Sequence, residues 1–460
     1  MEGPEKFKTK AEKAVDDIVR QEVFDDNIAN YNTSLNIALS QFQNLELARK
    51  RAGNIRFKAI NSLEKYLIEF ESNFEKNGGK LLWALSAEEA LDEISSILKK
   101  HKTKRIIRSR TLVSDEINLD AFLESENIES VKVSPADWIL NRFEEKPRHA
   151  SSFLIEKSLE QIIDKISDKD GTGFKHNPAG VINFIKNISR TNVEDIHVSI
   201  SGASYLIADT GSLCISENHG DGILLNAVSG VNIILCGIDK IIPSLSSLDT
   251  LIPLYSSFSS GDRINAFNSI ISGPRAENET DGPSELYVIL LDNGRSEVLA
   301  QKHQRRALGC IDCGACQNVC PVYRKIGGDT FDTTYTGPIG SVLNPWMNGM
   351  EEYIHQSYAS TLCGHCTEIC PVNINIHQQL LYNRNDSIRM KNYSSGEKMT
   401  MEAWHLVLSN RKWMDKSNAK WKNIFLKKIY ADKWGKQRTF PKISEKSFKQ
   451  LWEERREGKN

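Results

Sequence analysis

Cys310-Ile-Asp-Cys313-Gly-Ala-Cys316-Gln-Asn-Val-Cys320-Pro321 is the first of two cysteine runs around which this chain is organised, and Cys363-Gly-His-Cys366-Thr-Glu-Ile-Cys370-Pro371 is the second. Seven of the nine cysteines lie in these two short segments. Thiolates so close in sequence can converge on the corners of one iron–sulfur cube, because each sulfur then binds a different iron. The spacing C-x2-C-x2-C-x3-C-P is typical of proteins with two clusters, in which the fourth cysteine binds the other cluster. The runs therefore predict iron–sulfur binding.

The paired arrangement assigns every thiolate of the two runs to a cluster. The first cluster is predicted to be held by Cys310, Cys313, Cys316 and Cys370, and the second by Cys320, Cys363 and Cys366. The second cluster is one thiolate short, because Ser360 stands where a complete run would have its first cysteine. Three forms are open: a [4Fe–4S] cluster with Ser360 or solvent as the fourth ligand, a [3Fe–4S] cluster, or a cluster whose open iron acts on a substrate as a Lewis acid.

Zinc is the main alternative to iron–sulfur clusters, because C-x2-C pairs also suit a tetrahedral zinc ion. Seven thiolates exceed one zinc site and do not divide well into two, so the runs favour iron–sulfur clusters. A second alternative is that the clusters only brace the fold. Two clusters that exchange ligands lie close together, which suits the transfer of single electrons. We therefore predict electron transfer.

Length and composition indicate a protein of several domains. At 460 residues the chain can form two or three domains, each with its own core. Apolar residues make up 40% and charged residues 26%, as in ordinary globular proteins. The first residues are charged, and no apolar stretch reaches about 18 residues, so we expect neither a secretory signal nor a membrane-spanning helix. A cytoplasmic protein is predicted.

Hydrophobic periodicity divides the chain into four segments. Residues 1–79 are predicted to be helical, because apolar residues such as Leu35 and Leu39 recur at spacings of three or four. In residues 80–300, strand-like runs alternate with helices, one of them predicted over residues 115–126, which indicates βαβ units and a mostly parallel sheet. Residues 301–390 carry the cysteine runs in helix-prone sequence, with residues 336–346 predicted as a loop. Residues 391–460 are predicted to form a loosely patterned helical tail.

Glycines punctuate residues 202–212, a stretch that could cradle an anionic ligand with backbone N–H groups. Tight turns of a sheet explain these glycines equally well, and neither G-x-G-x-x-G nor a P-loop pattern is present. Cys214 and Cys236 lie in strand-like apolar runs, so both are predicted to be buried small hydrophobic residues.

The tail differs from the rest of the chain in charge and in aromatic content. Residues 391–460 hold 18 Lys and Arg against 8 Asp and Glu, whereas the remainder holds 41 against 52. Five of the eight tryptophans also lie there. A cationic, aromatic tail predicts a docking surface for a partner subunit or for an anionic membrane face and, less readily, for nucleic acid.

Several further stretches, taken with both cysteine runs, resemble the lactate utilization protein B family, the iron–sulfur subunit of a bacterial L-lactate oxidation system. They are Arg108-Ser-Arg-Thr-Leu-Val-Ser-Asp-Glu116, residues 202–218, Gly237-Ile-Asp-Lys-Ile-Ile-Pro243, Ser272-Gly-Pro-Arg275, Leu291-Asp-Asn-Gly-Arg295 and residues 336–346. The resemblance covers most of the chain. Residues 222–230 are more apolar than the corresponding family stretch, which weakens any anion site there.

The resemblance implies an α/β domain similar to the sugar-phosphate isomerase and CoA-transferase-like fold, then an α-helical ferredoxin domain with two [4Fe–4S] clusters, and the tail. It favours the four-iron form for the second cluster, with a non-cysteine fourth position. It also implies two partner subunits, one cysteine-rich and one small α/β protein, with which the chain oxidises L-lactate to pyruvate and passes the electrons to an acceptor that the sequence does not name.

Three functions compete at this point. The leading one is an electron-transfer subunit of the lactate-oxidising complex, in the cytoplasm or peripherally at the inner face of the membrane through the basic tail. The second is a catalytic α/β domain that acts on a phosphorylated or CoA-linked substrate, with the clusters as accessory redox centres. The third, a sensor whose tail binds nucleic acid, is the weakest, since no nucleic-acid-binding fold is recognisable. We expect no nucleic-acid partner and assign no catalytic residue.

Overall fold

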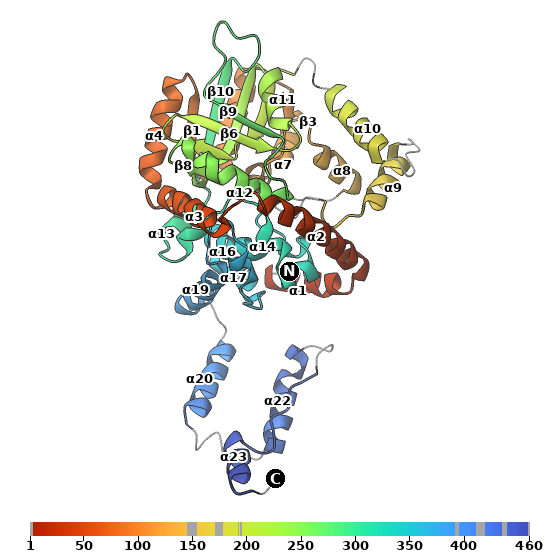
Figure 1. Ribbon diagram of the computed structural model, residues 1–460, viewed down its shortest axis with the longest axis vertical. Helices are drawn as coiled ribbons and strands as arrows, with labels where there is room; N and C mark the ends of the chain where they lie inside the picture. Colours follow the sequence, from red (N-terminus) through yellow and green to blue (C-terminus); the bar gives the residue numbers. More distant parts are fainter. Residues whose placement is uncertain are drawn as a thin grey trace. The chain divides into compact units, whose positions relative to one another are not determined.

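The structure, a computed structural model, describes residues 3–144, 154–170, 178–191, 193, 196–391, 395–410, 419–434 and 439–458. Its internal contacts divide the chain into one unit over Met1–Ser387 and another over Ile388–Asn460. Each unit is described by itself below (Figure 1). The predicted domain boundaries at residues 79, 300 and 390 stay predictions.

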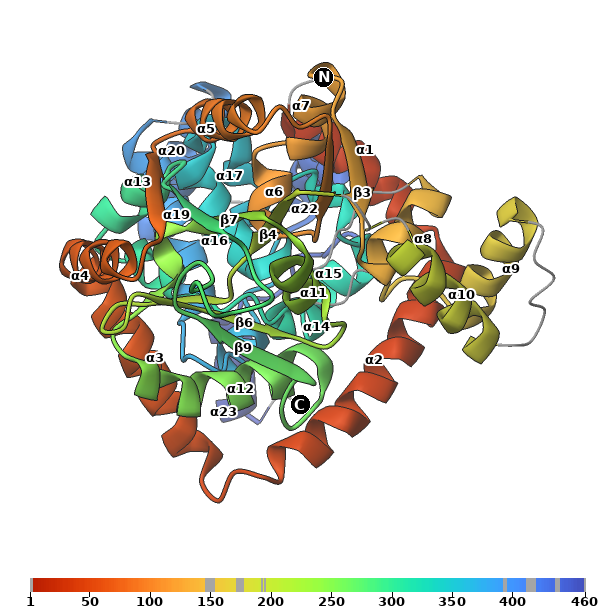
Figure 2. The same ribbon diagram turned by 90° about the horizontal axis from the view of Figure 1, so that it is seen from above.

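Four helices come first in the larger unit, as the apolar periodicity predicts. They are α1 (Gly3–Val15), α2 (Ile18–Leu39), α3 (Leu45–Asn61) and α4 (Leu63–Lys76). Helix α4 buries Leu63, Leu67, Phe70 and Phe74 along one face. Figure 2 shows α2, α3 and α4 following one another around the edge of this unit. These helices therefore wrap a core that other parts of the chain supply.

The main sheet is parallel throughout and has six strands in the order β1-β10-β7-β4-β2-β3. The strands are β1 (Lys80–Ala84), β2 (Arg105–Arg108), β3 (Glu129–Lys132), β4 (Val198–Gly202), β7 (Val231–Gly237) and β10 (Glu285–Leu291). Every residue of β7 is buried, as the near-continuous apolar sequence of an inner parallel strand requires. The predicted parallel sheet is confirmed.

Helices connect the strands of this sheet along the chain. They are α5 (Ala87–Lys100), α6 (Leu112–Glu116), α7 (Leu119–Ser125), α8 (Pro135–Phe143), α9 (Leu159–Asp170), α10 (Pro178–Thr191) and α11 (Asp221–Val228). The single helix predicted over residues 115–126 is wrong, because the chain breaks into α6 and α7 at Asn118. Asn118 adopts a φ of +52°, the left-handed region that asparagine tolerates better than most residues.

A second sheet, which the sequence did not predict as a separate sheet, has four strands in the order β8-β5-β6-β9. They are β5 (Tyr205–Ile207), β6 (Ser212–Glu217), β8 (Ile241–Ile242) and β9 (Phe267–Ile271), and helix α12 (Leu248–Ser260) lies nearby in the same unit. Leu206 and Leu213 of this sheet share a core cluster with Ile234 and Val288 of the main sheet. The two sheets are thus joined by packing.

The segment that carries the cysteines is built from short helices. They are α13 (Arg295–Ala300), η3 (Gln304–Gly309), α14 (Ala315–Asn318), α15 (Pro321–Ile326), η4 (Asp329–Phe331), α16 (Gly337–Met347), α17 (Met350–Tyr358), α18 (His365–Glu368) and α19 (Ile376–Arg389). The loop predicted over residues 336–346 is wrong, because this stretch forms α16. Pro338 lies in its first turn, where a missing N–H costs little, and nine consecutive residues of the helix are buried.

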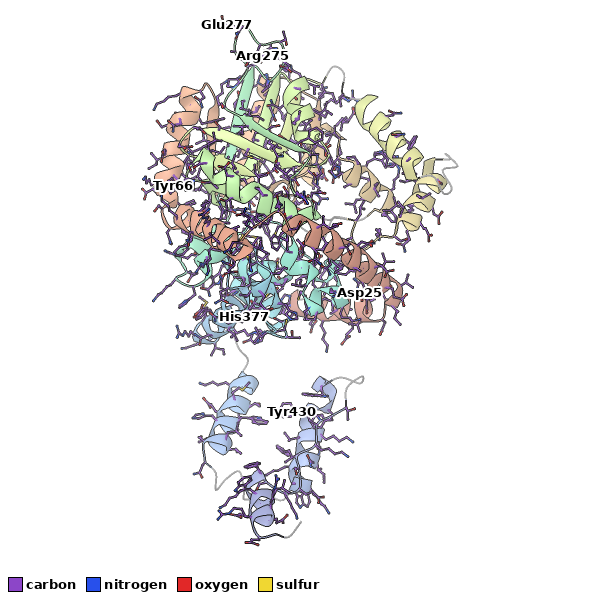
Figure 3. The ribbon with its side chains drawn as sticks, viewed as in Figure 1. Asp25, Tyr66, Arg275, Glu277, His377 and Tyr430 are labelled. Atoms are coloured by element: carbon purple, nitrogen blue, oxygen red, sulfur yellow. The ribbon has the colours of Figure 1, made fainter. Side chains whose placement is uncertain are left out.

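The C-terminal unit contains α20 (Ser395–Ser409), α22 (Ala419–Trp434) and α23 (Phe448–Arg456). Trp404 Nε1 donates a hydrogen bond to Tyr430 OH at 3.1 Å and so links α20 to α22 (Figure 3). Large apolar side chains of these helices are exposed, among them Trp421 (73%) and Phe425 (65%). Among the helices in the described ranges, none is long and apolar enough to cross a membrane.

Candidate iron–sulfur centres and an adjoining pocket

The two cysteine runs fold alike. Gly314 (φ +70°) begins α14 and Gly364 (φ +89°) begins α18, and each of these four-residue helices carries a cysteine, Cys316 or Cys366. A residue with a side chain would be strained at this φ, so glycine suits both turns. The last cysteine of each run follows its helix directly. In the first run this is Cys320, the N-cap residue of α15.

Four cysteines from both runs line one small cavity. They are Cys310, Cys313, Cys316 and Cys370. Apolar side chains such as Ile339, Val372 and Ile374 complete its wall. Cys370 of the second run thus lies beside three cysteines of the first run, and the prediction that these four hold one cluster stays a prediction.

Backbone N–H groups face the sulfurs of this cavity. The Asp312 amide lies 3.4 Å from Cys310 Sγ, and the Ile374 amide lies 3.3 Å from Cys370 Sγ. Burial raises the pKa of Cys313 to about 12 and raises the pKa of Cys370. Buried thiols of this kind become thiolates when positive iron binds them, and N–H donors then stabilise the sulfur charge. The donor set fits an iron–sulfur cluster.

The remaining three cysteines form a second group nearer the protein surface. Burial, together with the nearby charges of Cys320 and Cys363, raises the pKa of Cys366 to about 12. Burial also raises the pKa of Cys320, to which the charge of Cys363 contributes. Cys363 itself is exposed. Ser360 is half-buried, and its Oγ accepts a hydrogen bond from the Leu362 amide at 3.1 Å.

Other side chains surround the second group. His377 of α19, labelled in Figure 3, has its Nδ1 2.7 Å from the hydroxyl of Thr367, the residue after Cys366. Within the described ranges, no three or more His, Cys, Asp or Glu side chains are grouped as ligands of a single metal ion. The second group therefore offers three thiols, two of them buried or half-buried, and its fourth ligand stays a prediction.

A buried network of charges joins the α/β domain to the first run. Lys240 Nζ lies 2.6 Å from Asp312 Oδ2 and 3.2 Å from Asp239 Oδ2. Arg295 Nε lies 2.6 Å from Asp239 Oδ1. Burial alone would raise the pKa of Asp239, but Lys240 and Arg295 hold it below its ordinary value. Charges removed from water in this way are tolerated because each has a partner.

Arg56 of α3 makes a second connection between the α/β domain and the segment before Cys310. The sequence did not reveal this role. Its side chain is 1% exposed and donates to the carbonyl oxygens of Ile241 (2.7 Å), Gly309 (3.2 Å) and Leu308 (3.2 Å), and also to that of Asp239. One guanidinium therefore holds the N-terminal helices, the α/β domain and the segment before Cys310 together. An arginine in a helix of mixed sequence carries no signal of such a role.

A pocket of about 540 Å³ opens at the carboxyl ends of β2, β4 and β7. Ligands of open parallel sheets bind in the crevice outside the carboxyl ends of the strands, at the point where the strand order reverses. Polar residues at its wall include Arg110, Glu217, Asp221 and Lys240. The sequence pointed to this region only through the glycine-punctuated stretch.

Only part of that stretch reaches the pocket. Gly202 to Tyr205 line it, whereas residues 206–212 run from the end of β5 through a turn at residues 208–211 into the start of β6. At Gly211 (φ +61°) a Cβ would lie 2.3 Å from the Phe74 amide nitrogen, so close packing explains this glycine. Cys214 and Cys236 are 0% and 1% exposed, which confirms their predicted burial, and Cys236 lines the pocket wall.

Both the α/β domain and the segment that carries the cysteines match known protein families. A LUD domain model matches residues 67–291, and a 4Fe–4S dicluster domain model matches residues 306–374. A lactate utilization protein B from Bacillus licheniformis is 32% identical over 435 residues, which cover 92% of this chain and 91% of that protein. The chain belongs to the lactate utilization protein B family.

Other lactate utilization B proteins show similar identity and coverage. The lactate utilization protein B of Bacillus subtilis is 32% identical and covers 91% of this chain, and that of Oceanobacillus iheyensis is 29% identical and covers 99%. The match reaches 88% and 98% of those two proteins. A DUF162 family protein from Deinococcus radiodurans, whose crystal structure is solved, is 13% identical and aligns with 50% of this chain and 98% of its own at a TM-score of 0.29, too low to bear on the fold.

Family membership confirms two predictions. The resemblance to lactate utilization protein B is correct, and the dicluster match spans both cysteine runs, which implies iron–sulfur clusters. The chain is a LUD domain with a parallel sheet, followed by a helical 4Fe–4S dicluster region and C-terminal helices. The assignment of individual ligands stays a prediction.

Proposed function

We propose that the chain is the iron–sulfur electron-transfer subunit of a multi-subunit complex that oxidises L-lactate to pyruvate. Membership of the lactate utilization protein B family supports the metabolic setting. The observation that carries the proposal is the cavity lined by four thiols from two separate cysteine runs. Clusters held this way supply carriers that accept and release one electron at a time.

Specific residues would hold the two clusters. Cys310, Cys313, Cys316 and Cys370 would hold the first, and Cys320, Cys363 and Cys366 the second, with Ser360 or solvent in its fourth position. The surrounding residues exclude water from the first group through apolar walls and direct backbone N–H groups at its sulfurs. Both clusters are proposed as [4Fe–4S], with [3Fe–4S] as the alternative for the second.

The exposure of the two groups suggests an order for electron transfer. Cys363 is exposed, whereas Cys313, Cys316 and Cys370 are buried. Partner subunits would therefore exchange electrons first with the second group, since a short path favours transfer. Two partners are proposed, one cysteine-rich and one a small α/β protein. The exposed aromatic and basic helices α20, α22 and α23 form a docking surface for them, with an anionic membrane face as the alternative.

The LUD domain is proposed to have a topology similar to the sugar-phosphate isomerase and CoA-transferase-like fold. The pocket at the carboxyl ends of its strands favours a second candidate function, catalysis on a phosphorylated or CoA-linked substrate. This candidate is weakened because the cations in the pocket wall are already paired with carboxylates. Arg110 is paired with Asp115 and Asp137, and Lys240 with Asp312 and Asp239, so an anion would have to displace these carboxylates.

Anaerobic purification of the full chain tests the proposed function. We expect eight irons and eight sulfides per chain, because each of two cubes holds about four of each, and EPR signals of two interacting centres after reduction. Seven irons and a three-iron signal would establish the [3Fe–4S] form of the second cluster. Lactate oxidation should be negligible for the isolated chain and should appear with both partner subunits. Lactate oxidation by the chain alone would overturn the proposal.

A further inference from the structure

The pocket of the LUD domain and the cavity of the first cysteine group share a wall. Leu112, Ile311, Asp312 and Tyr335 line both of them. Asp312 and Ile311 belong to the first cysteine run itself. A ligand in the pocket would therefore lie one layer of side chains from the sulfurs of the first group. At so short a separation electrons pass readily, since the rate of electron tunnelling falls steeply with distance.

The charges of the pocket exclude a strongly anionic ligand. Arg110 Nε lies 2.8 Å from Asp115 Oδ2, and its Nη1 lies 3.4 Å from Asp137 Oδ1. Lys240 Nζ lies 2.6 Å from Asp312 Oδ2. Both cations of the wall are thus neutralised by carboxylates, and a phosphate or carboxylate group in the ligand would add uncompensated negative charge.

The remaining polar groups of the wall include seven serine and threonine hydroxyls, which can donate or accept hydrogen bonds, as well as carboxylates, which accept them. Glu217 and Asp221 contribute carboxylates to the pocket wall. Asn265, 5% exposed, donates its amide nitrogen to Ser216 Oγ, and its carbonyl oxygen has no partner among the described residues. A wall of this kind can donate hydrogen bonds to carbonyl oxygens of a ligand through its hydroxyls and can accept them from ligand hydroxyls through its carboxylates.

Apolar surface makes up most of the pocket lining, from residues such as Leu112, Val113 and Leu235. The volume of about 540 Å³ lies in the range of sites for small organic molecules. An uncharged ring system with a few polar oxygens matches the apolar walls and the hydroxyl groups between them. Such a molecule next to an electron-transfer centre has one evident use, which is to carry electrons.

We propose that this pocket binds a quinone, an uncharged two-electron carrier, and its hydroquinone form. This inference rests on the proposed function, which supplies the electrons. A bound quinone becomes hydroquinone by taking up two electrons, one from each of the two iron–sulfur centres, and two protons from water. No bond between heavy atoms forms or breaks. Glu217 and Asp221 accept hydrogen bonds from the hydroxyls of the hydroquinone.

The experiment uses the full chain with its clusters loaded and duroquinone as the probe. Duroquinone has no free ring position, so it does not alkylate cysteines. Equilibrium dialysis measures binding directly, and reoxidation of the reduced chain by duroquinone or by ferricyanide is followed through cluster absorbance. Ser109→Leu and Ser204→Leu place bulk in the pocket wall, and Ser96→Leu on the exposed face of α5 is the matched control.

We expect saturable binding at one site per chain. Each pocket variant should raise the Kd for duroquinone about tenfold or more, because the larger side chain overpacks the site. The same variants should slow reoxidation by duroquinone and leave reoxidation by ferricyanide unchanged, while Ser96→Leu alters neither. The EPR spectra of the variants verify that both centres remain intact.

Three outcomes would overturn the proposal. They are duroquinone binding that both pocket variants leave unchanged, riboflavin binding at this site in the absence of duroquinone binding, and stabilisation by coenzyme A alone. Failure of the clusters to assemble would instead contradict the proposed function, and dialysis would still report on the pocket. The two failures are therefore distinguishable.

Discussion

Lys240 of the α/β domain donates a hydrogen bond to Asp312 of the first cysteine run, with 2.6 Å between Nζ and Oδ2. Asp312 lies between Cys310 and Cys313 and has a φ of +55°. Lys240 also lies 3.4 Å from the Cys310 carbonyl oxygen. Because the lysine is 11% exposed and its partner 24%, this ion pair ties the LUD domain to the loop of the first centre.

Replacement of Lys240 by methionine should therefore destabilise the chain strongly. The variant leaves Asp312 without its cation and Asp239 with Arg295 alone, and breaking a buried pair costs about 3–5 kcal/mol. Urea unfolding of the cluster-loaded chain measures the loss. Lys80→Met is the control, because Lys80 pairs with Glu285 while 45% exposed and should matter little. Equal losses in the two variants would contradict a special role for the Lys240 pair.

Arg56→Met tests the connection made by α3. The substitution keeps the length of the side chain but removes the donors to four carbonyl oxygens. Buried acceptors without partners destabilise a fold, so we expect a loss of about 3–5 kcal/mol in the free energy of unfolding. Arg51→Met, on the exposed side of the same helix, should change that free energy little. A small effect of Arg56→Met would show that water replaces the guanidinium.

Single serine substitutions test the crossing of the two runs. Cys370→Ser should remove the first centre and spare the second, whereas Cys320→Ser should do the reverse, because each final cysteine is predicted to bind the distant cluster. Each variant should lose about half of its iron. Iron analysis and EPR identify which centre is lost. The control is Cys236→Ser, a buried cysteine outside the runs, which should keep full iron content.

Asp221 makes the stability depend on pH in a defined direction. Burial, with a contribution from the charge of Asp137, raises the pKa of Asp221 to about 6 in the folded chain, from 3.8. The folded state then binds the proton more tightly than the unfolded state, so stability due to this group is present below pH 4 and is lost as pH rises through 6.

Asp221→Asn should remove this dependence. At pH 7 the variant is expected to be more stable than the parent chain by about 2 kcal/mol, after allowance for the partial exposure of the carboxyl. Near pH 4 the difference should vanish, since the parent carboxyl is then protonated. Urea unfolding across this range measures both values. Asp281→Asn in an exposed loop should show no such pH-dependent gain.

Removal of residues 392–460 tests the independence of the C-terminal helices. Contacts within Met1–Ser387 and within Ile388–Asn460 form separate groups, so the truncated chain should keep its iron content and its unfolding midpoint. Binding to the partner subunits should be lost, as measured by co-purification. A truncated chain that still binds them would locate the docking surface elsewhere.

Much of the candidate site followed from the sequence, because cluster chemistry imposes strict local spacing. Most of the thiolates that share one cluster lie within a few residues of each other. The runs around Cys316 and Cys366 could therefore be recognised without a structure. The parallel sheet could be predicted for a similar reason, since buried parallel strands such as β7 need an unbroken apolar sequence. Local sequence preference failed for α16, which was predicted as a loop. Its prolines and glycines favour loops, but they are buried in a helix here.

Only the tertiary structure decided how the two halves of the chain meet. Arg56, Lys240 and Tyr335 come from three distant segments, and nothing in the neighbouring sequence of any of them indicates its partners. The pocket likewise collects residues from the ends of separate strands and shares its wall with the first centre. The sequence by itself determined the iron–sulfur chemistry, because ligand spacing is local. The position of the pocket beside the first group of cysteines depended on long-range packing, which local sequence does not encode.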